Sequence, residues 1–198
     1  MKMNEKSVRI FQSDWMESLT HVPVWLPATI WIPVIAYFLY NTIMSGAFGV
    51  FQLVAIAFFA ISFWSFTEYM LHRFLFHAEF ENPKLQRMVF LLHGVHHDYP
   101  NDSERLLMPP LAAIPIAAIF WVGFNAILGA QFAQPFFAFF LVGYLIYDYI
   151  HYGTHHFRIK SSVMKELKKN HMAHHFVAPD LYFGVSSPIW DRFFDTMK

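Results

Sequence analysis

Histidine is concentrated in four short segments of this 198-residue chain, which contains 12 histidines and no cysteine. Imidazole is a good ligand for zinc, copper, iron and nickel, and the lack of cysteine excludes thiolate ligands. His21 stands alone and is interpreted as a ring satisfied by neighbours or solvent. The other histidines predict a metal centre and lie in the segments HRFLFH (72–77), HGVHH (93–97), HYGTHH (151–156) and HMAHH (171–175).

The spacing within each segment decides which rings can face one centre, because positions i, i+3 and i+4 share a face of a helix. The triplets 93/96/97 and 171/174/175 meet this rule, and His151 and His155 are four residues apart. His72 and His77 lie about 140° apart on a regular helix. They can serve one centre only if the helix ends or distorts there; otherwise they serve different ions. His156 points away from His151. The candidate ligands are His72, His77, His93, His96, His97, His151, His155, His171, His174 and His175.

Ten imidazoles exceed the needs of one ion, because the metals that imidazole suits take about four to six ligands. Two ions with about five ligands each would keep an open position for water or substrate, as catalytic metals do. A pH sensor also gathers histidines, but it does not need four groups at helical spacing. Bound histidines usually donate their second N–H to a carboxylate or carbonyl. Glu68, Asp148 and Asp98 are expected either in that role or as interfacial charges.

The rest of the chain indicates a membrane protein. Charged residues make up only 14% of it, against about 25% in a typical soluble domain. No Asp, Glu, Lys or Arg occurs over residues 18–67 or 106–147. A spanning helix needs about 20 apolar residues, so each block fits two spans and a tight turn. We expect an all-α integral membrane protein with four transmembrane helices in two hairpins, at approximately 23–41, 48–70, 108–127 and 134–152.

Two other interpretations of the apolar blocks fit less well. A signal peptide is disfavoured because the first apolar run follows a polar tail of about 20 residues and no small-residue cleavage site is clear. A soluble helical bundle would need polar helix faces, which these segments lack.

The cations predict the orientation. All 14 Lys and Arg residues lie in the amino-terminal tail, between the two apolar blocks or in the carboxy-terminal segment. The positive-inside rule then makes both termini cytoplasmic. The chain, 1–198, is expected to be one membrane-embedded domain whose cytoplasmic helical cap, 71–107 and 153–198, holds a His-rich dimetal site. The formal net charge of 0 provides no basic field for nucleic acid.

The histidine segments, followed by FGVSSPIWDRFFDT (183–196), resemble the fatty acid hydroxylase and sterol desaturase superfamily. The stretches FTEYMLHRFLFH, RLLMPP and GYLIYDYIHYGTHH are most similar to its fatty acid 2-hydroxylase group. This resemblance covers nearly the whole chain. It implies a membrane di-iron monooxygenase that uses O2 to hydroxylate C2 of a long-chain fatty acyl group, free or in a ceramide-type sphingolipid. It also implies two iron ions on the ten histidines, which zinc can replace in purified protein.

The resemblance implies roles for further residues. The stretch Tyr182–Trp190 is expected beside the metals, where it helps to shape the acyl entrance; an interfacial aromatic belt is the alternative for Trp190. His156 is expected outside the ligand set or facing substrate. Arg105 is expected to meet a polar lipid head or to snorkel.

Turnover requires two external electrons, so a separate donor is expected: cytochrome b5 or ferredoxin, with a reductase. The chain resembles the short plant and bacterial forms, which lack a fused cytochrome b5 domain. It has no cysteine for an iron–sulfur cluster and no G-x-G-x-x-G motif. The cationic stretch Arg158–Lys169 is expected to receive an acidic carrier or to meet anionic lipid heads.

Two alternative functions remain open. Another oxidase of the superfamily, such as a carotenoid or sterol hydroxylase or a desaturase, would share the histidine pattern. A non-enzymatic His-rich metal transporter would place its ligands near mid-membrane, whereas these histidines are predicted at the cytoplasmic ends of the spans. A bacterial inner membrane is the favoured location, with the endoplasmic reticulum expected in a eukaryotic host.

Overall fold

The structure, a computed structural model, describes residues 7–198 and contains helices and no strand within that range. Lys2 and Lys6, which contributed to the predicted orientation, lie outside the described residues. In the described part, three helical segments are long and apolar enough to cross a membrane: Leu26–Met44, Val50–Phe76 and Pro110–His156. They correspond to α2 (Leu26–Met44), α3 (Val50–Leu71) with its continuation, and α6 (Pro110–His156).

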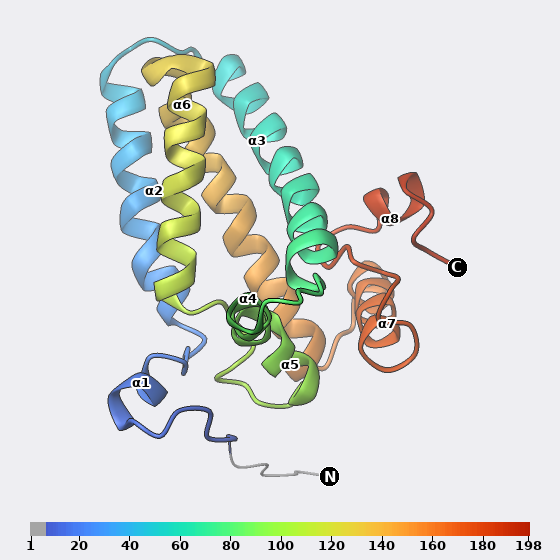
Figure 1. The fold of residues 1–198 in the computed structure, drawn as a ribbon. Coiled ribbons are helices and arrows are strands. Elements are labelled where there is room, and N and C mark those ends of the chain that lie inside the picture. Colours follow the sequence, from blue (N-terminus) through green and yellow to red (C-terminus); the bar gives the residue numbers. More distant parts are fainter. Residues whose placement is uncertain (1–6) are drawn as a thin grey trace.

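Helix α6 consists of two arms that fold back on each other (Figure 1). The reversal lies at Gly129, whose φ of 74° is a conformation that favours glycine. The ring centroids of Phe120 and Phe140 are 4.9 Å apart, whereas 20 residues of straight helix would separate them by about 30 Å. The predicted break between Leu128 and Pro135 is therefore found at Gly129.

The predicted span limits need correction by a few residues. Helix α2 begins at Leu26 rather than at residue 23, because Pro27 takes the first turn of the helix, where its missing N–H is not needed. The second arm of α6 continues to His156, four residues beyond the predicted end at 152. The HYGTHH segment is therefore part of this long helix.

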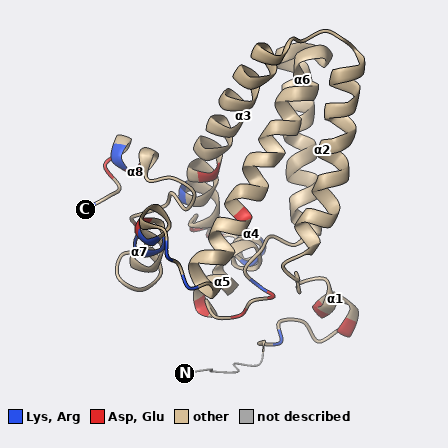
Figure 2. Ribbon diagram, turned by 180° about the vertical axis from the view of Figure 1, so that it is seen from behind, with Lys and Arg blue, Asp and Glu red and all other residues tan. Residues whose placement is uncertain are grey.

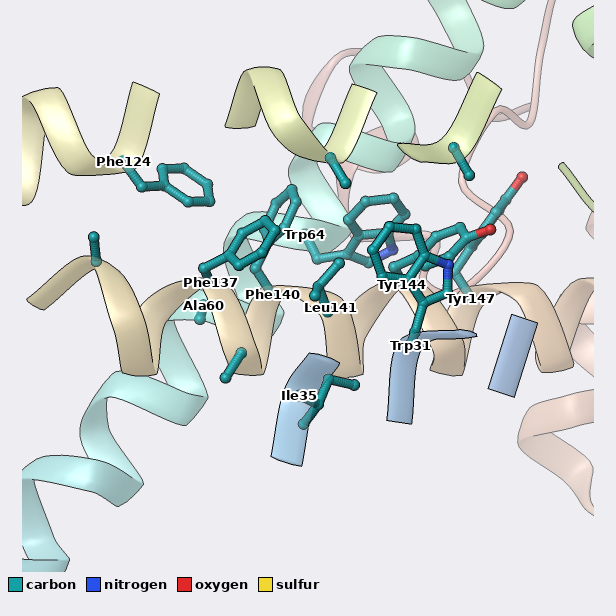
Figure 3. Packing of buried hydrophobic residues seen from close by; sticks show 14 of the residues in the cluster. Trp31, Ile35, Ala60, Trp64, Phe124, Phe137, Phe140, Leu141, Tyr144 and Tyr147 are labelled. Atoms are coloured by element: carbon teal, nitrogen blue, oxygen red, sulfur yellow. The ribbon is translucent and has the colours of Figure 1, made fainter. Parts of the chain in front are cut away.

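The apolar core lies between α2, α3 and the two arms of α6 (Figure 3). Trp64 on α3 packs edge-on against Phe140 and Tyr144, with centroids 5.0 and 5.2 Å apart. Gly143 makes this approach possible, since a Cβ there would lie 2.6 Å from the Cβ of Trp64. This close contact fixes the ends of α3 and α6, which carry histidine groups, relative to each other.

The short helices lie at or near one end of the bundle, where most of them form a cap, while the last of them lies beside α3 (Figure 1). In chain order they are α1 (Asp14–Ser18), the π-helical turn η1 (His72–Phe76), α4 (Pro83–Val89), the π-helical turn η2 (Phe90–Gly94), α5 (Val95–Asp98), α7 (Ser162–Phe176) and α8 (Ile189–Phe193).

Figure 2 shows that Lys, Arg, Asp and Glu lie in and near this cap, while the far part of the bundle carries none. Large apolar side chains on that part face outward, such as Phe51 at 92% and Ile127 at 80% exposure. Helices that are hydrophobic all round and outwardly exposed belong in lipid, so the chain is a membrane protein.

Arg105 fastens the amino-terminal tail to the cap. Its buried guanidinium donates to Ser7 Oγ at 2.8 Å and to Thr20 Oγ1 at 2.7 Å, and it pairs with Glu17. The prediction that Arg105 meets lipid or snorkels is wrong, because protein groups enclose it. His21 is satisfied, as expected, with Nδ1 2.7 Å from the carboxylate of Glu104.

Candidate metal centre

The ten candidate ligands form two groups of five. In each group the potential ligand atoms all lie within 4.8 Å of one another. Cluster 1 contains His72, His77, His93, His97 and His174, and cluster 2 contains His96, His151, His155, His171 and His175. The two clusters adjoin, because the rings of His97 and His175 stack with centroids 4.2 Å apart. The geometry therefore offers two neighbouring sites with five imidazoles each.

A distortion of the helix brings His72 and His77 into the same cluster. The backbone N–H of His77 donates to the carbonyl of His72 at 3.2 Å, the i→i+5 bond of a π-helix. Their ring centroids are consequently only 5.0 Å apart. Of the alternatives that the spacing left open, the distorted helix is the one found.

Each histidine triplet divides between the clusters, which the spacing rule did not predict. His93 and His97 face cluster 1 while His96 faces cluster 2. In the second triplet, on α7, His171 and His175 face cluster 2 while His174 faces cluster 1. Adjacent helical residues point about 100° apart, so a helix lying between two sites supplies both. The segment 93–97 and helix α7 are placed in this way.

The Nε2 atoms point at one another inside each cluster. The Nε2 of His93 lies 3.0 Å from that of His72 and 2.9 Å from that of His97. The Nδ1 atom of His72 donates to the carbonyl of Phe183 at 2.5 Å. Because a carbonyl only accepts, the proton of this neutral ring sits on Nδ1, and Nε2 presents its lone pair.

His174 is arranged like His72. Its Nδ1 donates to the carbonyl of Leu181 at 2.7 Å, and its Nε2 lies 3.0 Å from the Nε2 of His77. Lone pairs that converge on one point repel each other unless a cation lies between them. The donor set of cluster 1 therefore fits a metal ion.

Burial keeps the cap histidines in the form that binds metals. It holds the pKa values of His93, His96 and His171 well below the usual range, and the neighbouring imidazoles lower them further. Burial also lowers the pKa of His97 to about 2 and that of His174 to about 4. These rings are neutral at neutral pH, and a neutral imidazole is what a metal requires.

Glu68, Asp148 and Asp98 were expected either to accept a hydrogen bond from a ligand or to be interfacial charges, and none of them bonds directly to a cluster histidine. Glu68 makes no hydrogen bond to His72; its carboxylate accepts the N–H groups of Val185 at 2.6 Å and Ser186 at 2.8 Å. These N–H groups are in the interior and need an acceptor, so they take the carboxylate. Asp148 makes no hydrogen bond to His151, and one of its buried oxygens has no partner within residues 7–198. Asp98 is exposed.

The residues expected near the substrate lie outside both clusters. His156 stacks on Tyr152 with centroids 4.7 Å apart. The hydroxyl of Tyr182 donates to the main-chain oxygen of Lys198, and the indole N–H of Trp190 donates to Ser65 Oγ at 3.0 Å.

It is Phe183, within the predicted stretch 182–190, that lies on cluster 1. The centroid of its ring lies 5.7, 5.6 and 5.5 Å from the ring centroids of His72, His77 and His174. Sequence reasoning missed the carbonyls of Leu181 and Phe183, because a backbone acceptor leaves no side-chain signal.

Comparison with known proteins places this arrangement in a family. Residues 54–196 match the family described as fatty acid hydroxylase. The chain is 37% identical over 189 residues to the dihydroceramide fatty acyl 2-hydroxylase FAH1 of Arabidopsis thaliana, covering 96% of this chain and 79% of that protein. It is 33% identical to the fatty acid 2-hydroxylase of Mus musculus, covering 97% of this chain and 57% of that protein.

The fold agrees with the sequence matches. The solved structure of full-length scs7p, in which only the hydroxylase domain is visible, is similar with a TM-score of 0.87 at 34% identity. The similarity covers 93% of this chain and 70% of that one. The chain therefore belongs to the fatty acid hydroxylase family.

Proposed function

We propose that this chain is a metal-dependent monooxygenase that hydroxylates C2 of a long fatty acyl chain, free or within a ceramide. The observation that carries the proposal is the pair of five-histidine clusters at the cap end of an apolar bundle. Relatives that cover nearly all of this chain are fatty acid and ceramide hydroxylases by name. A hydroxylase of acyl lipids needs both parts, a metal centre and a membrane-embedded body.

Each cluster holds one ion in this proposal, and the ten clustered histidines are the ligands. Iron is the metal we expect. When bound, it supplies the oxidant from O2 that removes a hydrogen from an unactivated C–H bond. The protein's own part is to orient the ten rings, keep them neutral and hold the acyl chain in place.

A hollow among the membrane helices is suited to the acyl substrate. It has a volume of about 360 Å³ and lies between α3, the second arm of α6 and residues 186–190. Trp64, Ile146 and Trp190 form apolar walls, and Ser65 and Ser186 add hydroxyl groups. Ser186 is three residues from Phe183, whose carbonyl contacts His72. An acyl chain in this hollow would lie among the membrane helices with its polar head near the cap. The carbon atom held nearest to the metal cluster would then be the one that is hydroxylated.

The two arms of α6 give the proposed topology of four membrane crossings. The second arm alone, 130–156, exceeds the roughly 20 residues that a span needs. Both described ends of the chain then lie on the side of the cap (Figure 1). The cations gathered there (Figure 2) support a cytoplasmic cap, facing the cytoplasm of a bacterium in the favoured case.

Electrons are proposed to arrive from a separate protein, an acidic cytochrome b5 or a ferredoxin, at helix α7. This helix exposes Lys165 and Lys169 and also carries His171, His174 and His175. A carrier held on its outer face would be separated from the clusters by the width of one helix. Complementary charge would speed the encounter.

Lipid mass spectrometry of a host with and without this chain tests the proposed reaction. We expect acyl lipids that gain one oxygen, located at C2 by fragmentation. The matched control is the His96→Ala variant, which should produce no such lipid. Oxygen inserted only into sterols or carotenoids, or a new double bond without a hydroxyl group, would contradict the proposal and favour another oxidase of the superfamily. Metal uptake into vesicles without any oxidised lipid would favour a transporter.

A further inference from the structure

The segment that links α7 to α8 is bonded on both of its sides, and we call its residues 181–186 the strap. On one side, the carbonyls of Leu181 and Phe183 accept hydrogen bonds from His174 and His72 in cluster 1, at 2.7 and 2.5 Å. The strap is therefore the protein element that sets the orientation of these two rings.

On its other side, the strap donates four consecutive backbone N–H groups to two carboxylates. Phe183 and Gly184 donate to the two oxygens of Asp191 at 2.8 and 2.7 Å. Val185 and Ser186 donate to Glu68 at 2.6 and 2.8 Å. Both acids are almost fully buried, with Glu68 at 3% and Asp191 at 1% exposure. Neither belongs to a metal cluster. The side chain of Glu68 accepts hydrogen bonds from strap residues, and that of Asp191 accepts from the strap and from Thr196.

Further contacts hold Asp191 itself in place. Thr196 donates its hydroxyl to Asp191 Oδ1 at 2.8 Å and its N–H to the carbonyl of Asp191 at 2.8 Å. The hydroxyl of Tyr69, on α3, lies 3.0 Å from that of Thr196. Glycine at position 184 lets the strap pack closely against Ser187 and the carboxylate of Asp191. A Cβ there would lie 2.2 Å from the carbonyl oxygen of Ser187 and 2.7 Å from Asp191 Oδ2. The carboxylate is thus a fixed point to which the strap is tied.

We propose that Asp191 is a positioning residue for the metal in cluster 1. It holds the strap so that the carbonyls of Leu181 and Phe183 fix the rings of His174 and His72. Glu68 also holds the strap, by accepting hydrogen bonds from Val185 and Ser186 at its other end. The inference rests on the proposed function in one respect, namely that cluster 1 binds a metal ion. Groups that orient a ligand in this way typically change metal affinity by about 10–100-fold.

Two isosteric variants separate the loss of a strap hydrogen bond from the replacement of an acid by an amide, since each makes the same chemical change. In Glu68→Gln the amide oxygen can keep both backbone N–H bonds, and its NH2 group can donate to the Ser186 hydroxyl, which now accepts. In Asp191→Asn both carboxylate oxygens are already accepting from backbone N–H groups. In either orientation of the amide, its NH2 group replaces an oxygen that accepts from the N–H of Phe183 or Gly184. Two donors cannot bond to each other, so one hydrogen bond of the strap is lost.

The test is a chelator competition with Co²⁺ on the purified full-length chain in detergent. The unmodified chain is expected to bind two ions; binding none would refute the proposed function and not only this inference. We expect Asp191→Asn to weaken one of the two ions about 10–100-fold and Glu68→Gln to weaken it much less. The matched control is Arg192→Gln, which removes an exposed ion pair with Glu166 next to Asp191 and should leave both ions unchanged.

Double variants assign the weakened ion to a cluster. With His171→Ala, which removes a ligand of cluster 2, Asp191→Asn should weaken the ion that remains. With His174→Ala, which removes a ligand of cluster 1, Asp191→Asn should leave the remaining ion unchanged.

Three results would overturn the proposal: wild-type affinity for both ions in Asp191→Asn, equal weakening in Asp191→Asn and Glu68→Gln, or weakening of the cluster 2 ion. If Asp191→Asn does not fold, Gly184→Ala displaces the strap from the other direction. A folded Gly184→Ala chain with both affinities unchanged would overturn the proposal equally.

Discussion

The two histidine clusters are alike in composition but differ in what lies behind their rings. In cluster 1 the outer nitrogens of His72 and His174 donate to carbonyls of the strap. In cluster 2 the Nδ1 atoms of His96, His171 and His175 are buried and have no hydrogen-bond partner in the part of the chain that the structure describes. A distant segment of the chain thus fixes the protonated nitrogen in two rings of cluster 1. The orientation of these three rings of cluster 2 depends on helix geometry and packing.

This difference separates two ways of preparing a metal site. Each cluster takes its rings from three segments, as two local pairs and one single ring. In cluster 2 both pairs are i, i+4 pairs of regular helix, at 151/155 on α6 and 171/175 on α7. In cluster 1 one pair is of this kind, at 93/97, whereas His72 and His77 come together only through the π-helical turn. Long-range packing assembles both clusters, but only in cluster 1 do strap carbonyls accept hydrogen bonds from two of the rings, His72 and His174. We therefore expect cluster 1 to respond to changes far away in sequence and cluster 2 to respond mainly to changes in its own helices.

The largest expected effect is the loss of activity when a ligand is removed from either cluster. His174→Ala in cluster 1 and His155→Ala in cluster 2 should each lower hydroxylation by more than about 100-fold, beyond the range for groups that only orient a ligand. The measurement is 2-hydroxy lipid formed per chain. His21→Ala, which changes a ring in the Arg105 network, should retain most of the activity. If one cluster tolerated the change, the clusters would not act together.

The pH dependence of stability tests whether the cap rings are neutral without metal. The folded-state pKa values of His97 and His174 are about 2 and 4, below the ordinary value of 6.5. Below about pH 6.5 the unfolded chain therefore binds more protons than the folded chain. The free energy of unfolding consequently decreases as the pH is lowered. Each such ring contributes at most about 1.4 kcal/mol per pH unit.

Thermal unfolding of the metal-free protein in detergent measures this effect between pH 7.5 and 4.5. We expect the midpoint to fall as the pH is lowered, and a smaller fall in a chain with His97→Gln and His174→Gln. A midpoint that is flat over this range would show that the rings are not held in the neutral form.

Gly143→Ala should disturb both clusters, in contrast to the changes in the strap. The added methyl group would lie 2.6 Å from the Cβ of Trp64 and would push α3 away from α6. Overpacking of this kind typically costs about 1–3 kcal/mol, measured as a lower unfolding midpoint. Gly123→Ala is the control, because a Cβ there meets nothing within 4 Å. Equal midpoints for the two variants would contradict the close packing of the helices that carry the clusters.

The smallest expected effect is at the outer face of α7. Reversing the charges of Lys165 and Lys169 to Glu should slow turnover several-fold at limiting electron carrier, while metal content stays unchanged. In the unmodified protein, salt should slow turnover with the same carrier, because screening weakens the charge attraction. A reversed variant that is as fast as the unmodified protein would remove α7 as the landing surface and would leave the clusters untouched.

The sequence predicts what depends on composition and spacing. The stretches without charge predicted the apolar helices, and the residues around Gly129 predicted the turn within α6. The four histidine segments contain all ten histidines that come together, and helical spacing grouped every one of them except His72 and His77, which it left dependent on a distortion of the helix. These features depend on periodicity and on the length of a membrane span, both of which are local.

The features that were missed depend on contacts between distant segments. The division of each triplet between two clusters follows from where segment 93–97 and α7 lie in the cap. Glu68 was predicted from its closeness to His72 in sequence, but the N–H groups of residues 185 and 186 compete for its carboxylate. Arg105 reads as a charge at the membrane surface, and only the fold shows the tail that encloses it. Spacing along one helix carries no information about such partners.

The central claim, two ions on two five-histidine clusters, is tested most directly by metal counting. The purified chain is loaded anaerobically with Fe²⁺, separated from free metal and analysed for iron per chain. We predict about two ions for the unmodified chain, about one for His72→Ala, about one for His151→Ala and about none when both are changed, with unchanged helical content. One ion in the unmodified chain, or two in either single variant, would contradict the account.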